Sequence, residues 1–571
     1  MSDTDKLILG LWDGHESGAA LVSGSQVVFA INEERLTRRK LEIGFPARSI
    51  QACLQFAGCK PDDISDVAIS TWDPAKTLTR CVPSLAEQYY QIRRKKVDMT
   101  ASQRRRKLLK YKITELPPNE IARSFSNRAV SRHLRELAFS RPAPHWYDHH
   151  YCHATAAAFC SGFDKALVIT IDGIGDGLSG SISAFEDGKL RRISAISGKT
   201  SLGIFFEHVT NLLNMRELED EGKVMALANF AFPVADSANP LLDYFEVDGL
   251  TLRAKYGSVR MYRELQRVLW RYPSEQFAAM AQRVLEIKVV QLMQNAMQQT
   301  GLHRIAYSGG VASNIKVNML VHDLPGVERL FVFPHMGDGG LALGAAMAAN
   351  HELHGVARYS LPNLFLGPSF EDGDILAAAQ KAGLVCRKSD DVVKETAQLI
   401  HGGEIVLWFQ GRMELGPRSL GARSILARPD SEEMKNELNL KLKKRVYYQP
   451  FCPAMLHLDA AEILENYKGV PNPFMTVGYR VRPEYRAAVR GVINIDGSCR
   501  PQILHEENSR IARLLREYRK LAGRGILLNT SFNTHGEPIV CAPADAVRTF
   551  VETDVNYLIM EDFIVTKTKR A

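Results

Sequence analysis

The sequence predicts an α/β protein of two domains, the first of which is duplicated around a central cleft. Residues 8–34 and 166–196 carry the duplication, because each reads as an apolar strand, an Asp-Gly turn, a second strand, a hairpin and a third strand. At 571 residues the chain also exceeds what a single hydrophobic core supports. A second α/β domain is therefore expected after the linker-like stretch at residues 352–372.

The repeat places two aspartates in equivalent turns. Asp13 follows the first expected strand of one repeat and Asp172 that of the other, and a glycine comes after each. Both carboxylates are expected to face the cleft between the halves. Helical sequence follows each repeat: residues 47–140 read as helical and basic, and residues 259–300 have the apolar spacing of core helix.

Composition argues against several classes of protein. The nine cysteines form no CxxC motif and are odd in number, so a disulfide framework is not expected. No uninterrupted apolar run reaches the ~18 residues of a membrane span, and the first residues lack a secretory pattern. A cytoplasmic protein without a membrane partner is expected.

The net charge of +8 is modest for this length, and part of the excess lies in residues 93–110. Because no aromatic residues interleave with these charges, the stretch is interpreted as a solvated helical face, and nucleic acid is not an expected partner. It can still attract an anionic substrate.

Three histidines within five residues, in DHHYCHATAA, indicate a metal site. On a helix, His149 and His153 share one face and can both reach one metal ion, whereas His150 points elsewhere. Paired histidines are more often structural, but three so close together favour metal. Carboxylates from Asp172 and Asp338 can complete the shell, and this mixed nitrogen and oxygen set suits Fe(II), Mn(II) or Zn(II).

Glycine-rich and cation-rich motifs indicate phosphate binding. Ser308, Gly309 and Gly310 end a β-rich run and open onto a probable helix, where backbone N–H groups can cradle a phosphate. Residues 411–424 and 441–445 place arginines and lysines beside glycines and hydroxyls, which predicts a polyphosphate pocket. The alternative is that these are surface loops, and hydrogen-bonded turns are an equal alternative for LLNTSFNTHGEP.

A series of ordered motifs resembles the NodU/CmcH carbamoyltransferase family over essentially the whole chain. They are HESGAAL, EERLTRRK, DHHYCHATAA, IDGIGDG, EGKVMALA, SGGVASN, GDGGLALGAA, GRMELGPRSLGARS and NTSFNTHGEP. The resemblance implies a Kae-type domain of the actin-like (ASKHA) superfold at residues 1–355 and a YrdC-like domain at residues 356–571.

The resemblance also implies an ATP-dependent O-carbamoyltransferase. The YrdC-like domain would convert carbamoyl phosphate and ATP, with Mg(II), to carbamoyl-adenylate. The metal-bearing domain, with Fe(II) preferred over Mn(II) or Zn(II), would transfer the carbamoyl group to a hydroxyl of a small natural product or saccharide. A homodimer is compatible with this class of enzyme.

The family's site residues can be carried over to this chain by their motifs. The metal ligands would be His149, His153, Asp172 and Asp338, and the catalytic residues would be His15 as base, Lys40 and Arg418. The nucleotide contacts of the first domain would be Glu221, Gly222, Lys223, Ser308, Gly309, Gly310 and Asn314. Those of the second domain would be Ser419, Arg423, Lys444, Arg445, Arg500, Asn529 and Asn533.

One motif departs from the family pattern. Where the family reads Lys-Arg-Glu-x-Phe-Arg-Pro, this chain reads KRVYYQP, so Val446 replaces an acid and Gln449 an arginine. An amide cannot supply the charge of a guanidinium group, which puts phosphate affinity in question. Two alternatives stay open: threonylcarbamoyl transfer to tRNA, and a non-catalytic actin-like ATP-binding protein.

Overall fold

A computed structural model describes residues 6–97, 100–505 and 509–567. The chain forms two compact units. Unit 1 consists of residues 1–33 and 41–361, and unit 2 consists of residues 34–40 and 362–571. The observed break at Leu361 lies six residues after the expected one, within the same linker. The assignment of residues 34–40 to unit 2 was not predicted.

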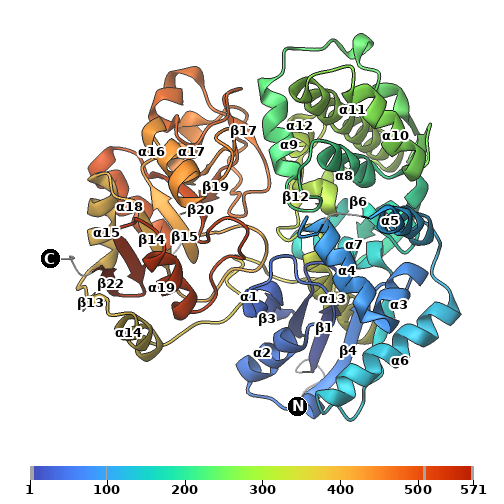
Figure 1. The fold of residues 1–571 in the computed structure, drawn as a ribbon, viewed down its shortest axis with the longest axis horizontal. Coiled ribbons are helices and arrows are strands. Elements are labelled where there is room, and N and C mark those ends of the chain that lie inside the picture. The colour runs from blue at the N-terminus through green and yellow to red at the C-terminus, as the bar shows by residue number, and fades with distance from the viewer. Residues whose placement is uncertain (1–5, 98–99, 506–508, 568–571) are drawn as a thin grey trace. The chain divides into compact units, whose positions relative to one another are not determined.

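The first sheet of unit 1 has three antiparallel strands followed by two parallel ones (Figure 1). The order across the sheet is β3-β2-β1-β4-β5. The strands are β1 (Leu7–Trp12), β2 (Gly18–Ser23), β3 (Gln26–Asn32), β4 (Ile64–Ser70) and β5 (His145–Tyr147).

The second sheet of unit 1 has the order β12-β11-β6-β7-β8. Its strands are β6 (Lys165–Gly175), β7 (Leu178–Glu186), β8 (Lys189–Ser197), β11 (Arg304–Ser308) and β12 (Arg329–Val332). The first three are antiparallel and the last two run parallel to β6. The two sheets therefore share one topology, as the repeat in the sequence predicts.

Helices of unit 1 follow each repeat. They are α2 (Ala47–Ala57), α3 (Pro74–Cys81), α4 (Pro83–Arg93), α5 (Ala101–Thr114), α6 (Glu120–Glu136), α7 (His149–Cys160), α8 (Leu202–Leu212), α9 (Glu221–Leu227), α10 (Ser258–Leu269), α11 (Ser274–Thr300), α12 (Ile315–Asp323) and α13 (Leu341–His354). A small hairpin, β9 (Phe245–Asp248) and β10 (Thr251–Ala254), precedes α10. The expected core helix at residues 259–300 is thus two helices, α10 and α11, and both contribute to one extensive apolar core of the unit.

Close packing of α13 on α7 and β1 positions the polar residues of unit 1. A Cβ atom at Gly344 of α13 would lie 2.2 Å from the carbonyl oxygen of Cys152 on α7. A Cβ atom at Gly10 of β1 would lie 1.9 Å from the carbonyl oxygen of Ala342. Only glycine permits these contacts, which fix α13 and the turn that precedes it against α7.

Unit 2 is built on a mixed sheet with the order β13-β22-β21-β14-β15-β20-β16-β19. Its strands are β13 (Val385–Lys388), β14 (Val406–Phe409), β15 (Arg423–Ala427), β16 (Cys452–Leu456), β19 (Gln502–Leu504), β20 (Ile526–Ser531), β21 (Tyr557–Met560) and β22 (Phe563–Thr566). A separate two-stranded ladder pairs β17 (Tyr479–Arg480) with β18 (Ser498–Cys499).

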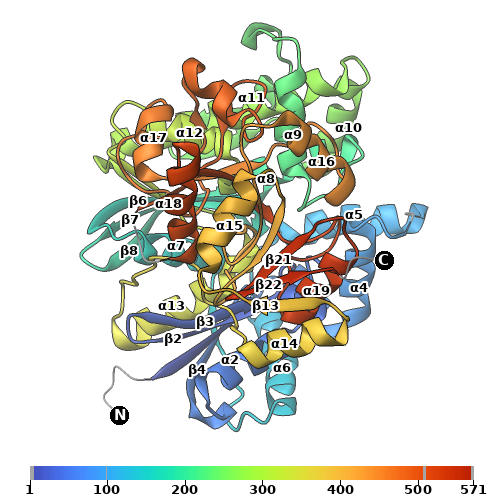
Figure 2. The same ribbon diagram turned by 90° about the vertical axis from the view of Figure 1, so that its left-hand side faces the viewer.

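The helices of unit 2 are α1 (Glu34–Thr37), α14 (Asp372–Lys381), α15 (Val392–His401), α16 (Glu432–Glu437), α17 (His457–Ile463), α18 (Arg510–Ala522) and α19 (Pro543–Val551). Helix α15 packs against α18 and α14 against α19, and both pairs can be followed in Figures 1 and 2. The core includes the fully buried side chain of Trp408. Among the described residues, no helix is long and apolar enough to cross a bilayer.

Candidate active site

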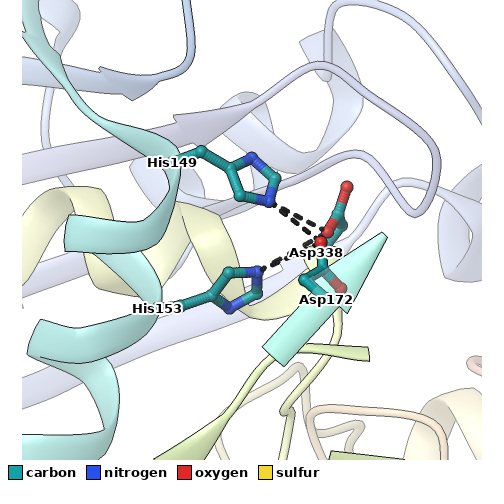
Figure 3. Close-up of side chains that lie close together, drawn as sticks. All are labelled: His149, His153, Asp172 and Asp338. Carbon is teal, nitrogen blue, oxygen red and sulfur yellow. Dashed lines mark hydrogen bonds and ion pairs between the residues drawn. The ribbon is translucent and has the colours of Figure 1, made fainter. Parts of the chain in front are cut away.

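Four side chains of unit 1 form a buried histidine and carboxylate cluster (Figure 3). Helix α7 carries His149 and His153, strand β6 carries Asp172, and Asp338 begins the short 3-10 helix that leads into α13. The Nε2 atom of His149 lies 3.2 Å from Asp172 Oδ2 and 3.5 Å from Asp338 Oδ1. The Nε2 atom of His153 lies 3.6 Å from Asp338 Oδ1. The predicted ligands therefore converge on one point.

The cluster fits a single divalent cation. Its four ligand atoms lie within 4.8 Å of one another, and ligands on opposite sides of one ion at ~2.1 Å would be about 4.2 Å apart. All four residues are at most 7% exposed. The buried Nε2 atom of His153 has no hydrogen-bond partner among the described residues, so a metal ion would supply the contact that it lacks.

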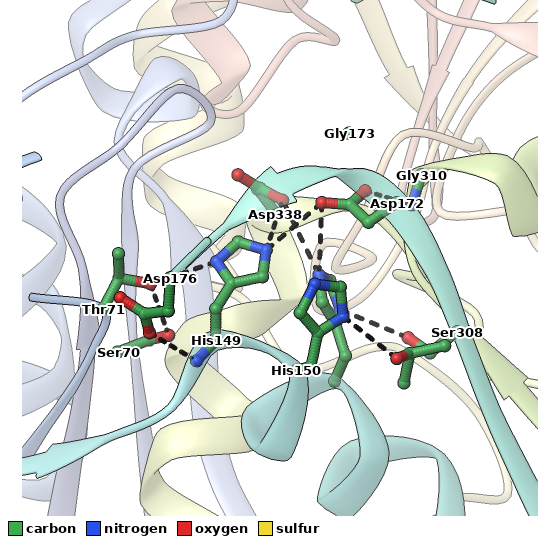
Figure 4. A network of polar contacts seen from close by, with 12 residues as sticks. Ser70, Thr71, His149, His150, Asp172, Gly173, Asp176, Ser308, Gly310 and Asp338 are labelled. Carbon is green, nitrogen blue, oxygen red and sulfur yellow. Dashed lines mark hydrogen bonds and ion pairs between the residues drawn. The ribbon is translucent and has the colours of Figure 1, made fainter. Parts of the chain in front are cut away.

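Neighbouring groups orient these ligands (Figure 4). Thr71 Oγ1 lies 3.0 Å from His149 Nδ1, and Asp176 accepts a hydrogen bond from the His149 backbone N–H. Asp172 Oδ1 accepts a hydrogen bond from the N–H of Gly310, at 2.6 Å. Such outer contacts fix the ring tautomer and the carboxylate orientation that a metal requires.

Charges within the cluster hold a proton where a metal ion would bind. Burial by itself lowers the pKa of His149, but the negative charges of Asp338 and Asp172 outweigh it and raise this pKa to about 9. Burial opposes ionisation of Asp172 too, but the hydrogen bond and charges of His149 and His153 hold its pKa well below the usual range. A divalent cation would replace this proton as the positive charge that the aspartates require.

Of the other predicted residues, His15 adjoins the histidine and carboxylate cluster, whereas His150 lies outside it and Lys40 belongs to unit 2. His150 lies outside the cluster, as predicted, with Nδ1 3.0 Å from Thr170 Oγ1. His15 adjoins the cluster, since its Nε2 lies 3.2 Å from Asp338 Oδ2. Lys40 belongs instead to unit 2, where its charge acts on Lys443.

The two equivalent aspartates have different partners. Asp13 pairs with Lys76 at 3.0 Å and with Arg80 at 2.7 Å. Burial would raise the pKa of Asp13, but these two cations hold it below its usual range. Asp172, expected in a turn, lies within β6, whereas Asp13 follows the end of β1. Equivalent positions of the repeat thus hold a candidate metal ligand in one half and an ion-paired carboxylate in the other.

The Ser-Gly-Gly turn serves the cluster directly. Gly309 has a φ of 95°, and a Cβ atom there would lie 2.3 Å from the carbonyl oxygen of Ile171. Its N–H donates to the Met336 carbonyl, the N–H of Gly310 donates to Asp172, and Ser308 Oγ lies 3.4 Å from His153 Nδ1. The N–H groups expected to cradle a phosphate are therefore occupied within unit 1.

The remaining nucleotide candidates of unit 1 lie around α9 and α12. Burial is the main cause that raises the pKa of Glu221 to about 8, and Lys223 Nζ lies 2.7 Å from Asp220 Oδ1. Nothing lies within 4 Å of a Cβ atom placed on Gly222. Asn314 caps α12 and donates to Gln282, which lines a cavity of about 250 Å³.

Three cations of the basic stretch at residues 93–110 form ion pairs inside unit 1, so they are not part of a solvated face. Arg93 bonds Glu207 at 2.9 Å, Arg94 pairs with Glu219, and Lys107 pairs with Glu217. The side chains of Arg93, Arg94 and Lys107 are 11%, 6% and 13% exposed. The interpretation was wrong for these three residues because the carboxylates on and near α8 and α9 are remote in sequence. Lys95 and Lys96 are exposed, as expected, and the side chains of residues 104–106 lie outside the described part.

In unit 2, Arg423 stabilises the loop that joins β14 to β15. It is completely buried, stacks 3.5 Å from the centre of the Phe409 ring, and donates to the carbonyls of Gln410 and Gly411. Glu414 supports the same loop, since its carboxylate accepts the N–H groups of Leu420, Ala422 and Arg423. The guanidinium group of Arg423, expected at a ligand, is committed to backbone carbonyls.

The Arg423→Met variant is expected to lose about 3 kcal/mol of local stability in β14 and β15, because buried carbonyls lose their donors. Hydrogen–deuterium exchange of peptides from these strands measures this loss. The exposed Arg513 of α18 provides the control, Arg513→Met, which should exchange like the wild type. Unchanged protection in Arg423→Met would contradict the structural role.

Unit 2 also contains a cluster of cations held by neutral groups. Lys443 is 4% exposed and donates to Ser531 Oγ at 3.1 Å and to Asn533 Oδ1 at 2.7 Å. Burial, together with the positive charges of Arg445 and Lys40, holds the pKa of Lys443 well below its usual range. Burial and the charge of Arg500 likewise lower the pKa of Arg445 to about 10. An anion would relieve this repulsion.

The residues predicted for the phosphate site of unit 2 differ in exposure and in their hydrogen-bond partners. Lys444 is exposed and Arg418 half-buried. The adjacent Lys443 belongs to the cation-rich segment 441–445 but was not among the contacts carried over from the family. The amide of Asn529 donates to the carbonyl of Ser419, and its own buried Oδ1 has no partner among the described residues. Gln449 Oε1, at the position of the family arginine, is likewise buried without one.

Comparison with known proteins gives one consistent result for the sequence. Residues 7–347 match a family model described as carbamoyltransferase N-terminus, and residues 397–567 match one described as carbamoyltransferase C-terminus. Nodulation protein NolNO of Sinorhizobium fredii is 31% identical over 97% of this chain and 79% of its own length. Nodulation protein NolO of Bradyrhizobium diazoefficiens is 34% identical over 74% of this chain and 79% of its own length.

Solved structures are only distantly similar. The component A of (R)-2-hydroxyglutaryl-CoA dehydratase from Acidaminococcus fermentans covers 60% of this chain and 97% of its own, with 16% identity and a TM-score of 0.34. Full-length HypF in a phosphate- and nucleotide-bound form covers 62% of this chain and 57% of its own, with 15% identity and a TM-score of 0.32. Scores this low do not assign a fold.

Proposed function

This chain belongs to the carbamoyltransferase family, and from that premise we propose that it is an ATP-dependent O-carbamoyltransferase. Its acceptor is the hydroxyl of a small molecule, a natural product or a saccharide. The observation that carries the proposal is the convergence of His149, His153, Asp172 and Asp338 on one buried point. In this proposal unit 1 has the actin-like fold and unit 2 is YrdC-like.

The first half-reaction is assigned to the cation cluster of unit 2. Within the described part of the chain, no carboxylate pairs with Lys443, Arg445 or Arg500, and their positive charge suits the phosphates of carbamoyl phosphate and MgATP. Asn533 accepts a hydrogen bond from Lys443. Arg418, Ser419, Lys444 and Asn529 complete the set carried over by motif. Water cleaves carbamoyl phosphate to carbamate and inorganic phosphate. A carbamate oxygen then bonds to the α-phosphorus of ATP, pyrophosphate leaves, and carbamoyl-adenylate remains.

The second half-reaction is assigned to unit 1. A divalent metal, Fe(II), Mn(II) or Zn(II), held by the four ligands would act as a Lewis acid on the phosphate of the adenylate. His15 is the base: burial lowers its pKa despite the charge of Asp338, so its imidazole is neutral near pH 7 and can accept the proton of the acceptor hydroxyl. The hydroxyl oxygen then bonds to the carbamoyl carbon and AMP leaves.

The nucleotide part of the adenylate is assigned to the region between α9 and α12. The cavity of about 250 Å³ lies there, lined by Met280, Gln282 and Lys316 among others. The amide of Asn314 donates to Gln282 in its wall, and Glu221 is assigned to the same region by motif. Gly222 and Lys223 complete this set by motif. The Ser308-Gly309-Gly310 turn is left out of it, because its glycine N–H groups are bonded to Met336 and Asp172.

Transfer to tRNA is less well supported than the basic stretch of the sequence suggests. Within that stretch, residues 93–110, Arg93, Arg94 and Lys107 are paired with carboxylates inside unit 1. They are not available to neutralise RNA phosphates. A small acceptor is therefore the better proposal.

Purified protein given ATP, a divalent metal and carbamoyl phosphate is expected to release pyrophosphate. Omission of carbamoyl phosphate should stop this release, because carbamoyl phosphate supplies the carbamate that attacks ATP. A colorimetric pyrophosphate assay checks the result, with bicarbonate in place of carbamoyl phosphate as the control. If pyrophosphate release does not depend on carbamoyl phosphate, the proposed function is wrong.

A further inference from the structure

Lys110 of helix α5 holds an ammonium group against an aromatic ring. Its Nζ lies 2.9 Å from the centre of the Tyr89 ring, on α4, and the Arg93 guanidinium lies 4.5 Å from the same ring. Aromatic faces attract cations, so the ring fixes the position of the Lys110 charge. Two cations on one ring also repel each other.

Lys110 differs from its cationic neighbours in having no carboxylate partner. Lys76 pairs with Asp13 at 3.0 Å, and Arg93 bonds Glu207 at 2.9 Å. Lys107, one turn earlier on α5, pairs with Glu217. Within the described ranges, Lys110 Nζ forms no ion pair or hydrogen bond, although the side chain is partly buried. A sequestered ammonium without a counterion is destabilising unless a ligand supplies one.

Helix packing places Lys110 near the candidate transfer site. Helix α5, which carries Lys110, packs against α3, and Lys76 of α3 lies 4.9 Å from the centre of the Trp12 ring. Trp12 Nε1 in turn donates to the His15 carbonyl at 2.7 Å. The charges of Arg93 and Lys110 accordingly add to the burial that lowers the pKa of His15. Burial likewise dominates the raised pKa of Tyr89, to which the charge of Asp338 contributes. Lys110 and Tyr89 therefore share the electrostatic environment of His15 and Asp338.

We propose that Lys110, seated on the Tyr89 ring, is an anion subsite that binds the oxyanion of a reactant at the transfer site. This inference rests on the proposed function. A compact ammonium group suits a carboxylate or a phosphate, and the missing counterion is then part of the substrate. The oxyanion comes either from an acidic acceptor, such as a uronic acid, or from the phosphate of the activated donor.

Competitive acetylation of the full-length protein tests the subsite without requiring turnover. Brief treatment with acetic anhydride, followed by peptide mass spectrometry, reports the reactivity of Lys110 relative to Lys112, an exposed lysine on the same helix. The ligands compared are AMP, inorganic phosphate, methyl glucuronide and, as the neutral match, methyl glucoside. A bound oxyanion is expected to slow labelling of Lys110 about tenfold and to leave Lys112 unchanged.

The outcomes distinguish the two sources. Protection by methyl glucuronide alone supports an acidic acceptor, and protection by AMP or phosphate supports the donor phosphate. No protection by any of these oxyanions, or equal protection by methyl glucoside, overturns the subsite. Calorimetric titration of the protecting ligand should show about tenfold weaker binding to Lys110→Met than to Lys112→Met.

Failure of the subsite is separable from failure of the proposed function. Lys110→Met should still release pyrophosphate from ATP and carbamoyl phosphate, since that reaction is assigned to unit 2. If the wild type releases none, the proposed function fails, and the labelling of Lys110 still decides whether an anion binds there. If Lys110→Met does not fold, the wild-type labelling decides the question.

Discussion

Replacing His149 with alanine is expected to lower carbamoyl transfer by about 10³-fold, since a Lewis acid contributes several kcal/mol to such a reaction. Pyrophosphate release should continue near the wild-type rate, because unit 2 contains the groups assigned to that step. Carbamoyl transfer should fall because the Nε2 atom of His149 faces both Asp172 and Asp338, where the metal ion would bind. Without this imidazole, a cation keeps only three of its four protein ligands.

Metal content and both half-reactions should be measured together. Metal bound per chain is expected to fall in His149→Ala, as determined by elemental analysis after dialysis. His150→Asn, on the same helix, removes an imidazole that bonds Thr170 instead of the cluster, and should retain the metal. Normal metal content and transfer in His149→Ala would show that the cluster is not the metal centre.

Replacing Lys443 with methionine is expected to lower pyrophosphate release by about 10²-fold, through loss of a charge-assisted contact to phosphate. The ammonium group also holds Ser531 and Asn533 in place, so the loop after β20 should loosen as well. The KM for carbamoyl phosphate or for ATP should rise with the fall in kcat. Steady-state kinetics with each substrate varied in turn gives both constants.

The control for this change is on the same segment. Lys441 is 69% exposed and pairs with Glu437, so Lys441→Met should leave pyrophosphate release at the wild-type level. Equal loss in the two variants would point to a general effect of charge. Wild-type activity in Lys443→Met would refute the assignment of the anion site.

The parts of this molecule that could be predicted are those with short-range signals. Strand and turn periodicity in residues 8–34 and 166–196 led directly to two sheets of one topology. A spacing of four residues on a helix placed His149 and His153 on one face. The approach of Asp172 and Asp338 depends on tertiary packing. The sequence offered them only as carboxylates able to complete the shell, and the family motifs then assigned them as ligands.

The parts that could not be predicted depend on contacts distant in sequence or on irregular backbone. A π-helical turn, Leu438–Leu442, ends just before Lys443. Its wider period moves the following side chains away from helical positions, so the sequence did not distinguish the buried Lys443 from the exposed Lys444. The partners of Arg93 and Lys107 lie about 110 residues away along the chain.

The assignment of residues 34–40 to unit 2 has a consequence for biosynthesis and for engineering. Arg38 donates to the carbonyls of Pro538 and Ile539, some 500 residues downstream. During synthesis on the ribosome, residues 34–40 emerge early but cannot form their contacts with unit 2 until almost the whole chain has emerged. Unit 2 is therefore not a detachable module: a hybrid enzyme made by exchanging residues 362–571 must exchange the short N-terminal segment with them.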